Sequence, residues 1–403
     1  MKKIIWNGLK ISLLALTLNS AFAAEEKTPT IPAWLYKELG ASEAFINKQD
    51  YPQARKTLQK ALGKAKKGSY AQAITLSSLA SIYALDDQYK KAAKLLAAAL
   101  ATEQLTEQQQ QEASLNLGQL YMGTEQYQKA INKLAPWLRQ NPSPKNTEVR
   151  VLLANAYSQL KQYRKALPHI DYVIKHSRKP KESWLQFKLA ISYHLKDYAS
   201  AASVLRRLMA RYPDKKEYWQ QLATVYQQMQ KMSAALSIQQ LAYEKGFLRS
   251  EAEILHLVNL YLYKKQPYQA ANLLDKELGK QSVKPTSAHW ELLATAWANA
   301  REYKKAINAL EKASALHPKG KLYLQLGRIH VEQELWQAAI KALHKALAKG
   351  GLNREGEAYI LLGMSYYETQ QISEAQRAFK KAQRYSKTKK SAGQWLNYIN
   401  TPV

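Results

Sequence analysis

Few residues of this sequence are spaced so that they could catalyse a reaction or hold a metal ion. The eight histidines are scattered, no two of them are four residues apart, and the chain has no cysteine. A zinc site, which needs histidine or cysteine ligands at short regular spacings, is therefore not expected. The sequence also lacks the Gly-x-Ser-x-Gly motif of serine hydrolases and a glycine-rich phosphate-binding loop. We expect no enzyme, no metal or other cofactor, and no small-molecule substrate.

A different pattern of residues runs along the whole chain. An alanine recurs at intervals of 33 to 38 residues, at Ala54, Ala92, Ala130, Ala166, Ala202, Ala235, Ala270, Ala306, Ala339 and Ala375. A leucine lies thirteen residues before nine of them, at Leu79, Leu117, Leu153, Leu189, Leu222, Leu257, Leu293, Leu326 and Leu362. A large side chain follows each leucine by four residues, at Tyr83, Tyr121, Tyr157, Tyr193, Tyr226, Tyr261, Trp297, His330 and Tyr366. Ten copies of one pattern indicate an internal repeat.

One copy shows what each repeat contains. Residues 286–319 read TSAHWELLATAWANAREYKKAINALEKASALHPK, which predicts two amphipathic helices joined by a polar turn and followed by Pro318. Small residues mark where the helices cross closely. This order and spacing resemble the tetratricopeptide repeat, a helix-turn-helix unit of about 34 residues. The fold we predict is therefore an all-α α-solenoid, and the resemblance implies a right-handed superhelix of ten repeats.

The same pattern gives a structural explanation for several conspicuous residues. His330 occupies the tyrosine position of its repeat, so we expect it to be packed in the core. Tyr157, Tyr163 and Tyr193 are expected to make helix–helix contacts. The first repeat has Ala41 in place of the leucine, which is typical of an end unit.

A solenoid of this kind offers a surface, and the resemblance implies which residues line it. In tetratricopeptide repeats the concave groove is formed by the first helix of each pair. The corresponding residues here are Gln119, Asn155, Gln159, Thr224, Gln228, Asn259, Tyr263, Thr295, Asn299 and Arg328. Asn155 and Asn259 stand where the family often uses an amide to bind the backbone of a peptide. Val151 and Leu255 replace the lysine of carboxylate-binding members, which favours an internal segment over a free C-terminus. The alternative is that these amides are simply solvated.

Positive charge is the second informative property. The formal net charge is +29, and two stretches are free of acidic residues, residues 51–85 and 375–390. Their basic patches include Arg55, Lys56, Lys60, Arg377, Lys380, Lys381 and Arg384. These side chains either form a solvated face or attract an anionic partner through salt-sensitive steering. Nucleic acid is the usual partner of such a chain, but the predicted export signal described next makes that partner unexpected.

The N-terminus has the features of an export signal. Lys2 and Lys3 precede an apolar segment, and Ala21-Phe22-Ala23 is a small-x-small cleavage site. Cleavage after Ala23 would leave a mature protein with a net charge of +26, since it also removes Lys10. The apolar segment is shorter than the roughly 20 residues of a membrane span. We expect the protein in the periplasm of a Gram-negative bacterium.

These observations predict the organisation of the whole chain. Residues 1–23 are the signal peptide, 24–32 a linker, 33–387 the repeat solenoid, and 388–403 a C-terminal capping helix and tail. In the last segment Ala392, Trp395, Leu396 and Ile399 follow the spacing of one helix face. That helix either covers the last repeat or docks a partner.

A narrower resemblance bears on the partner. Residues 211–219 (RYPDKKEYW), 290–294 and 394–399 are similar to periplasmic repeat proteins found with TonB-ExbB-ExbD systems of gamma-proteobacteria. The similarity implies a non-enzymatic scaffold that contacts a periplasmic or inner-membrane protein, a TonB-complex component, during energised uptake of iron complexes. Two alternatives remain. One is an envelope-assembly scaffold whose basic surface binds peptidoglycan or anionic lipid, and the other is the non-catalytic repeat region of a glycosyl- or peptide-modifying enzyme.

Overall fold

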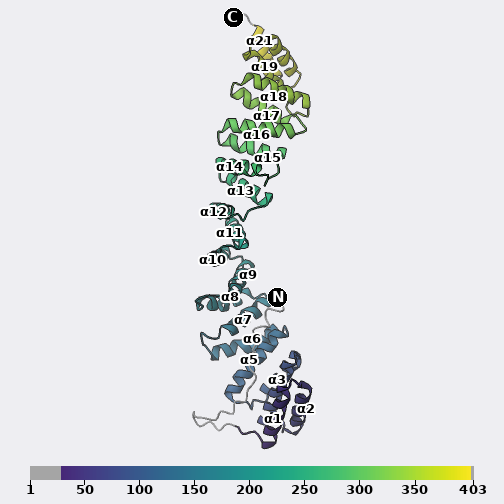
Figure 1. The fold of residues 1–403 in the computed structure, drawn as a ribbon, viewed down its shortest axis with the longest axis vertical. Coiled ribbons are helices and arrows are strands. Elements are labelled where there is room, and N and C mark those ends of the chain that lie inside the picture. The colour runs from purple at the N-terminus through teal and green to yellow at the C-terminus, as the bar shows by residue number, and fades with distance from the viewer. Residues whose placement is uncertain (1–28, 401–403) are drawn as a thin grey trace. The chain divides into compact units, whose positions relative to one another are not determined.

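The computed structural model describes residues 29–400, and all regular secondary structure in that range is helical (Figure 1). It contains 21 α-helices and, within residues 29–400, no β-strand. The predicted all-α α-solenoid is therefore confirmed. The predicted signal peptide lies outside the described residues.

Twenty of the helices form ten consecutive pairs, each with a first and a second helix. The first five pairs are α1 (Ala33–Asn47) and α2 (Tyr51–Lys64), α3 (Tyr70–Leu85) and α4 (Tyr89–Leu100), α5 (Glu107–Gly123) and α6 (Tyr127–Gln140), α7 (Thr147–Gln159) and α8 (Tyr163–Lys175), and α9 (Glu182–His194) and α10 (Tyr198–Arg211). The next five are α11 (Lys216–Gln228) and α12 (Met232–Glu244), α13 (Glu251–Tyr263) and α14 (Pro267–Gly279), α15 (Ser287–Asn299) and α16 (Tyr303–Leu316), α17 (Lys321–Glu332) and α18 (Trp336–Lys349), and α19 (Glu355–Glu368) and α20 (Ile372–Ala382). The last helix, α21 (Lys389–Asn400), follows the tenth pair.

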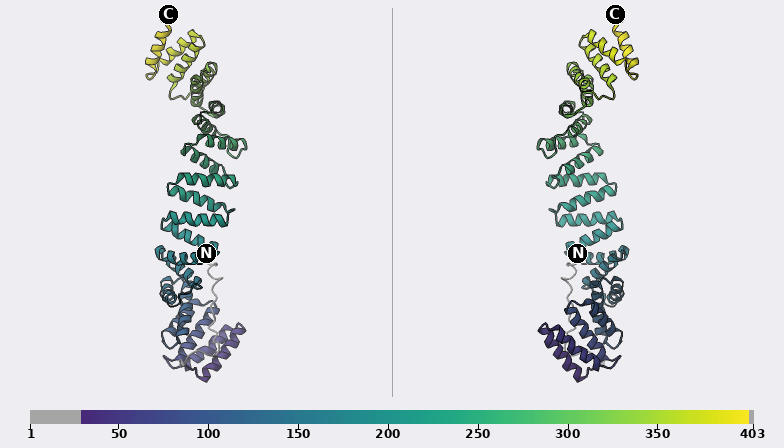
Figure 2. Two further views of the ribbon diagram at one scale, coloured as in Figure 1. Left: turned by 90° about the vertical axis from the view of Figure 1, so that its left-hand side faces the viewer. Right: turned by 90° about the vertical axis from the view of Figure 1, so that its right-hand side faces the viewer.

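The chain divides into two compact units between Leu208 and Met209, within α10. We call the N-terminal part unit 1 and the C-terminal part unit 2. Within each unit, helices that are consecutive in the sequence lie side by side (Figure 2). The predicted solenoid of residues 33–387 is thus shared between two units.

The same turn joins the two helices of every pair. One residue has a φ angle between 55° and 62°, and the N–H of the next residue donates to the carbonyl oxygen five residues earlier at 2.8–2.9 Å. This is the Schellman arrangement, in which a left-handed residue ends a helix. None of the ten left-handed residues is glycine; they are Gln49, Asp87, Glu125, Lys161, Lys196, Gln230, Lys265, Arg301, Glu334 and Gln370.

This turn corrects the register of the fifth repeat. In the other nine pairs the left-handed residue precedes the recurring alanine by five residues, but Lys196 precedes Ala201, not the predicted Ala202. Ala201 is fully buried, and Tyr198 three residues earlier matches the tyrosine that begins most second helices. The predicted Leu189 and Tyr193 are each one residue late for the same reason. The prediction was wrong because Leu189, Tyr193 and Ala202 repeat the pattern one residue after the structural positions.

The structural leucine position of that pair is filled by Lys188. Its ammonium lies 2.7 Å from a carboxylate oxygen of Asp171 on α8, so a polar contact replaces an apolar one. Ser192 takes the place of the tyrosine and donates through Oγ to Ser200 Oγ at 3.1 Å.

Small residues allow the helices of a pair to approach closely. Nine of the ten predicted alanines are at most 1% exposed, and the residue after each repeat leucine is glycine, alanine, serine or valine in nine pairs. At Gly118, Gly327 and Gly363 a Cβ atom would lie 2.5–2.6 Å from the side chain of Leu134, Leu343 or Phe379 on the second helix. A larger residue cannot fit there without moving that helix.

The fifth pair lacks a small residue at this position. With the corrected register Leu189 stands there on α9, and its side chain is buried.

The last repeat is covered by α21. Leu396 is buried against Ala375 and Phe379, and the Trp395 ring stacks on Phe379 with centroids 5.3 Å apart. Ala392 and Leu396 are the buried residues of α21, and Trp395 and Ile399 are half-buried. Because Phe379 is fully buried, α21 removes the last large apolar side chain from water.

Candidate functional site

The residues predicted to line the groove all lie on first helices, but they belong to both units. Gln119 is on α5 and Asn155 and Gln159 are on α7, all in unit 1. The others are in unit 2, with Thr224 and Gln228 on α11, Asn259 and Tyr263 on α13, Thr295 and Asn299 on α15, and Arg328 on α17. Two sets of residues must therefore be considered separately.

Six of the unit 2 residues form a regular exposed array, which we call the polar ladder. It consists of three pairs spaced four residues apart on successive first helices, Thr224/Gln228, Asn259/Tyr263 and Thr295/Asn299. Residues four apart lie on the same helix face, and all six are exposed. These six residues therefore form an exposed strip on three successive first helices, and their role in binding stays a prediction.

Hydrogen bonds connect α11 and α13, two of the helices that carry the polar ladder. The Gln220 amide donates to Glu253 at 2.7 Å, and the Gln227 amide lies 3.0 Å from the His256 ring nitrogen, so α11 is tied directly to α13. Glu253 also accepts from the backbone of Arg249 and completes the capping box of Ser250. Although burial alone would raise it, these bonds lower the pKa of Glu253 below its ordinary value. The carboxylate therefore remains ionised and keeps α13 in place.

The ladder has free hydrogen-bonding capacity. Thr224 and Thr295 donate to carbonyl oxygens in their own helices, those of Gln220 and Glu291. By contrast, no residue within 29–400 hydrogen-bonds the side-chain amides of Gln228, Asn259 and Asn299. Each amide offers both a donor and an acceptor, which matches the backbone of an extended peptide.

Tyr263 adds an apolar contact to the ladder. Its side chain is 68% exposed, more than any other large hydrophobic residue in the described part of the chain. Aromatic rings presented in this way supply much contact area with little loss of side-chain entropy. The ladder therefore combines one aromatic contact with several amides.

The remaining groove residues are less available. Gln119 and Asn155 are half-buried, and the Gln119 amide oxygen is buried without a hydrogen-bond partner among the described residues. Arg328 is held by Glu357, whose carboxylate oxygen lies 2.5 Å from its guanidinium. Only Gln159 of this group is exposed.

The basic patches are partly neutralised. In the first, Lys56 and Lys60 are exposed, but Arg55 pairs with Asp86 and lies over the Tyr83 ring at 5.2 Å. Hydrogen bonds from Gln88 and then from Arg55 lower the pKa of Asp86. Arg55 is therefore a structural cation.

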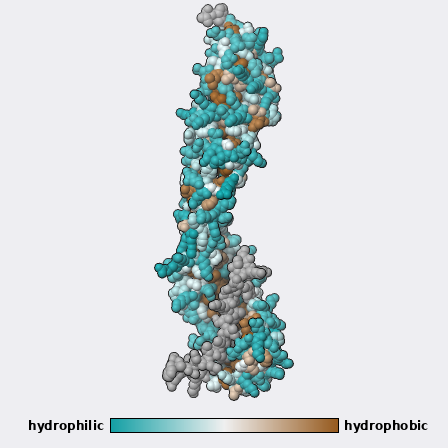
Figure 3. Space-filling view, viewed as in Figure 1, coloured by the Kyte–Doolittle hydropathy of each residue, from teal (hydrophilic) through white to brown (hydrophobic). Residues whose placement is uncertain are grey.

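The second patch is more open. Lys380 and Arg384 are exposed, while Arg377 lies 4.0 Å from Glu374 and Lys381 lies over the Tyr359 ring. Basic residues near a helix C-terminus also stabilise the helix, so part of this charge has a structural role. The space-filling view shows a mainly hydrophilic surface with scattered hydrophobic residues (Figure 3).

His330, which the sequence predicts to be structural, is held in the packed interior, and His169 is partly enclosed. His330 is 5% exposed, and burial lowers its pKa. His169 on α8 is half-buried, and burial followed by the charge of Arg150 lowers its pKa. The prediction for His330 is confirmed.

Sequence reasoning missed one set of exposed first-helix residues. With the corrected register, Ala190, Tyr193 and His194 of α9 occupy groove positions, which explains why all three are exposed. The tyrosine that begins most second helices, Tyr198 in this pair, was the signal that could have found them. His194 stacks on Tyr163 with ring centroids 4.3 Å apart.

The described residues offer no cluster of metal ligands and no membrane-spanning helix. Within residues 29–400 no group of three or more histidine, aspartate or glutamate side chains is arranged to hold a metal ion. None of the helices in that range is both long and apolar enough to span a bilayer.

Comparisons with known proteins agree with the repeat pattern. Family models of the tetratricopeptide repeat match residues 185–215 and 324–388. No curated protein matches the sequence.

Solved structures of other repeat proteins align only loosely. A tetratricopeptide repeat protein from Parabacteroides merdae is 16% identical over 74% of this chain and 98% of its own, with a TM-score of 0.37. The C-terminal part of a repeat-containing protein from Cytophaga hutchinsonii is 13% identical over 70% of this chain and 95% of its own, with a TM-score of 0.38. PilF of Pseudomonas aeruginosa is 16% identical over 52% of this chain and 90% of its own, with a TM-score of 0.33. Because these TM-scores are low, the identification of the repeats depends on the family-model matches and on the helix pairs. The matches identify tetratricopeptide repeats in this chain, at residues 185–215 in the fifth pair and 324–388 in the last two pairs.

Proposed function

We propose that this protein is a non-enzymatic scaffold that binds a segment of a partner protein along the polar ladder of unit 2. The observation that carries the proposal is the set of three exposed pairs on successive first helices, whose amides have no hydrogen-bond partner among the described residues. A surface of this kind can bind a peptide backbone with little specificity for the peptide's sequence. Tetratricopeptide repeats generally act by binding proteins, which supports the proposal.

The amides would bind the partner and the tyrosine would orient it. Asn259 and Asn299 each offer one donor and one acceptor, and a neutral hydrogen bond contributes about 0.5–1.5 kcal/mol net. Tyr263 lies four residues from Asn259 on the same face of α13 and would pack against an apolar side chain of the segment. Binding by several such contacts favours a segment several residues long over a single terminal group.

The location and identity of the partner are further parts of the proposal. The export signal predicted at residues 1–23 supports a periplasmic location, and it lies outside the described residues. In that compartment the partner would be a periplasmic or inner-membrane protein. The similarity of residues 211–219 and 394–399 to repeat proteins of TonB systems supports a TonB-complex component.

Capture of partners from periplasmic extract tests the proposal. The mature protein is immobilised, bound proteins are identified, and affinity for each is then measured with purified components. Replacing Asn259 and Asn299 with Ala should weaken binding about tenfold, which corresponds to about 1.4 kcal/mol. The matched control replaces Asn272 and Asn308, two exposed asparagines on second helices, and should leave affinity unchanged. Equal losses in both double variants, or none in the ladder variant, would refute the proposed site.

A second candidate function is supported by the basic patches. Lys56, Lys60, Lys380 and Arg384 are all exposed, so an anionic envelope surface such as peptidoglycan or anionic lipid is the alternative partner. Binding of this kind depends on long-range attraction and should weaken sharply with added salt. Sedimentation with peptidoglycan or phosphatidylglycerol vesicles, with and without Lys380→Glu and Arg384→Glu, distinguishes it from ladder binding.

A further inference from the structure

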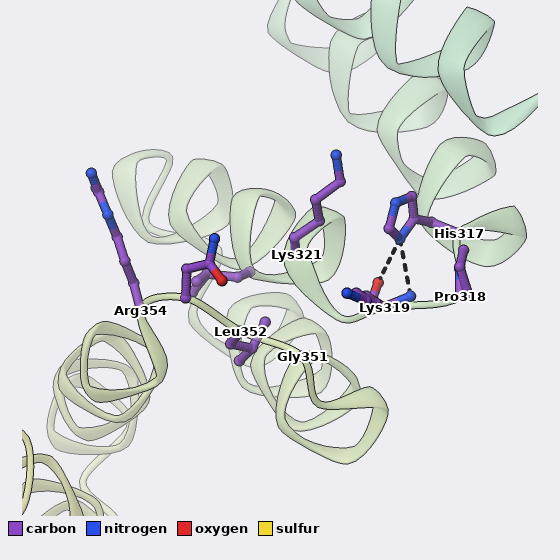
Figure 4. Close-up of a pocket in the computed structure, with 9 residues that line it drawn as sticks. His317, Pro318, Lys319, Lys321, Gly351, Leu352 and Arg354 are labelled. Atoms are coloured by element: carbon purple, nitrogen blue, oxygen red, sulfur yellow. Dashed lines mark hydrogen bonds between the residues drawn. The ribbon is translucent and has the colours of Figure 1, made fainter.

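A cavity of 530 Å³ lies between two loops of unit 2, away from the polar ladder (Figure 4). One loop, residues 317–320, follows α16, and the other, residues 350–354, follows α18. Both loops connect successive repeats, whereas the ladder residues lie within first helices. The volume is in the range of pockets that hold small ligands or a few residues of peptide.

The walls of the cavity are fixed by contacts between the two loops. The Gly320 N–H donates to the Gly350 carbonyl oxygen at 2.9 Å, and a Cβ on Gly320 would lie 2.0 Å from the Ala346 oxygen. Gly351 has a φ of 66°, and a Cβ there would lie 3.0 Å from Cδ of Lys319. The loops therefore touch through glycines, and the cavity exists before any ligand binds.

Apolar and positively charged groups line this cavity together. Pro318, Leu324 and Leu352 are its apolar residues, and Leu324 is buried. Figure 4 shows Lys321 and Arg354 extending to the same side of the loops, with Leu352 between them. A ligand here would need both a hydrocarbon part and negative charge.

The charge of the lining is one-sided. Its nine residues include three permanent cations, Lys319, Lys321 and Arg354, and no acidic residue. Lys321 and Arg354 form ion pairs with Glu291 and Glu357, each with 3.7 Å between the charged atoms, so their charges are partly neutralised. Lys319 is exposed and forms no ion pair with any residue in the described range. Its ammonium is the group most available to an anionic ligand.

Hydrogen bonding fixes the first residue of the loop that follows α16. The ring of His317 is held in place, since its Nδ1 accepts from the Lys319 N–H at 3.0 Å. Leu316, the residue before it at the end of α16, is 56% exposed.

From this combination we infer that the cavity binds an acidic protein segment. One apolar side chain of the segment packs against Leu324 and Leu352, and its flanking carboxylates face Lys319, Lys321 and Arg354. The inference rests on the proposed function in taking the ligand to be a protein, and it adds a second contact with defined chemistry. A concave site with an apolar floor favours one inserted side chain over the flat face of a bilayer.

Fluorescence anisotropy with a labelled peptide tests the inference. The probe is acetyl-Glu-Glu-Leu-Glu-Glu-amide, compared with one peptide that has Gln for each Glu and another that has Gly for Leu. We expect saturable binding of the first peptide by the full mature protein, and at least tenfold weaker binding of the other two. Lys319→Glu should weaken binding of the first peptide at least tenfold, and Lys319→Met, which keeps most of the stem, by less. The matched control is Lys341→Glu, an exposed lysine on α18 outside the cavity, and circular dichroism checks that each variant is folded.

Each remaining outcome overturns the inference. Equal losses in Lys319→Glu and Lys341→Glu would mean that the peptide responds only to net charge. Binding to phosphatidylglycerol vesicles without binding to the peptide would make the site a lipid contact. The Asn259→Ala/Asn299→Ala variant should bind the peptide normally, so loss of binding there would place the peptide on the ladder. A protein that captures a partner through the ladder but binds no acidic peptide would refute the cavity site and leave the proposed function intact.

Discussion

Replacing Gly363 with Ala should destabilise the last repeat, although the same change usually stabilises a helix. Gly363 lies within α19, and in a helix interior Ala is favoured over Gly by about 0.5–1 kcal/mol. A Cβ at this position would lie 2.6 Å from Cε1 and 2.7 Å from Cζ of Phe379. The Phe379 ring is fully buried and stacked on Trp395, so it has no free space to enter.

The expected magnitude follows from these opposing effects. Forcing an extra methyl group into a packed core typically costs about 1–3 kcal/mol. After the gain in helix propensity, we expect a net loss of about 0.5–2 kcal/mol. Gly40→Ala is the matched control, because Gly40 is also inside a helix and has no atom within 4 Å of the new Cβ. That variant should gain about 0.5–1 kcal/mol.

Urea denaturation followed by far-UV circular dichroism measures both changes, and hydrogen exchange of α19 to α21 locates the effect. Combining Gly363→Ala with Phe379→Leu should cost less than the sum of the two single changes, because Ala80 and Ala294 occupy the same position as Gly363 in pairs where a leucine, Leu96 or Leu310, occupies the position of Phe379. If Gly363→Ala stabilised the protein as much as Gly40→Ala, close packing between α19 and α20 would not be what selects glycine.

Three further predictions concern other parts of the molecule. Burial lowers the folded-state pKa of His169 and His330, so unfolding takes up protons and the protein should lose stability as the pH falls below the ordinary histidine pKa of 6.5. Urea midpoints measured across that pH range check this prediction, and the His330→Tyr variant should show a smaller pH dependence. Deleting residues 389–403 should expose Phe379 and lower the melting temperature or cause self-association, which calorimetry and light scattering detect. Ala306→Leu should cost about 1–3 kcal/mol, because Ala306 is 1% exposed between closely packed helices, and an unchanged urea midpoint would contradict the assignment of that crossing.

Most of the fold could be predicted because the repeat combines several independent constraints. Helical periodicity, small residues at crossings and recurring leucines all give the same register in nine pairs. The fifth pair failed because Leu189 and Tyr193 imitate the pattern one residue out of step, and only the turn at Lys196 reveals the correct register. The spacing of residue types alone does not show which hydrogen bond ends the first helix.

Exposure of the candidate site was harder to predict than its position. Asn155 and Asn259 occupy the same place in their repeats, yet the first is half-buried and the second exposed. The difference depends on side chains from neighbouring helices, which a repeat pattern does not describe. The cavity was not predicted because its two loops are about 30 residues apart in the sequence and are brought together only when repeats stack.

The polar contact of Lys188 has a consequence for how the protein denatures. In a linear array each repeat is stabilised by its own packing and by its immediate neighbours, and cooperativity is transmitted from one repeat to the next. The fifth pair, which contains the division between the two units, has Lys188 paired with Asp171 where other pairs have an apolar leucine. We therefore expect two cooperative blocks that melt in separate steps, and Lys188→Leu should bring the two transitions closer together. A single sharp transition in the native protein would show that the fifth pair couples the blocks fully.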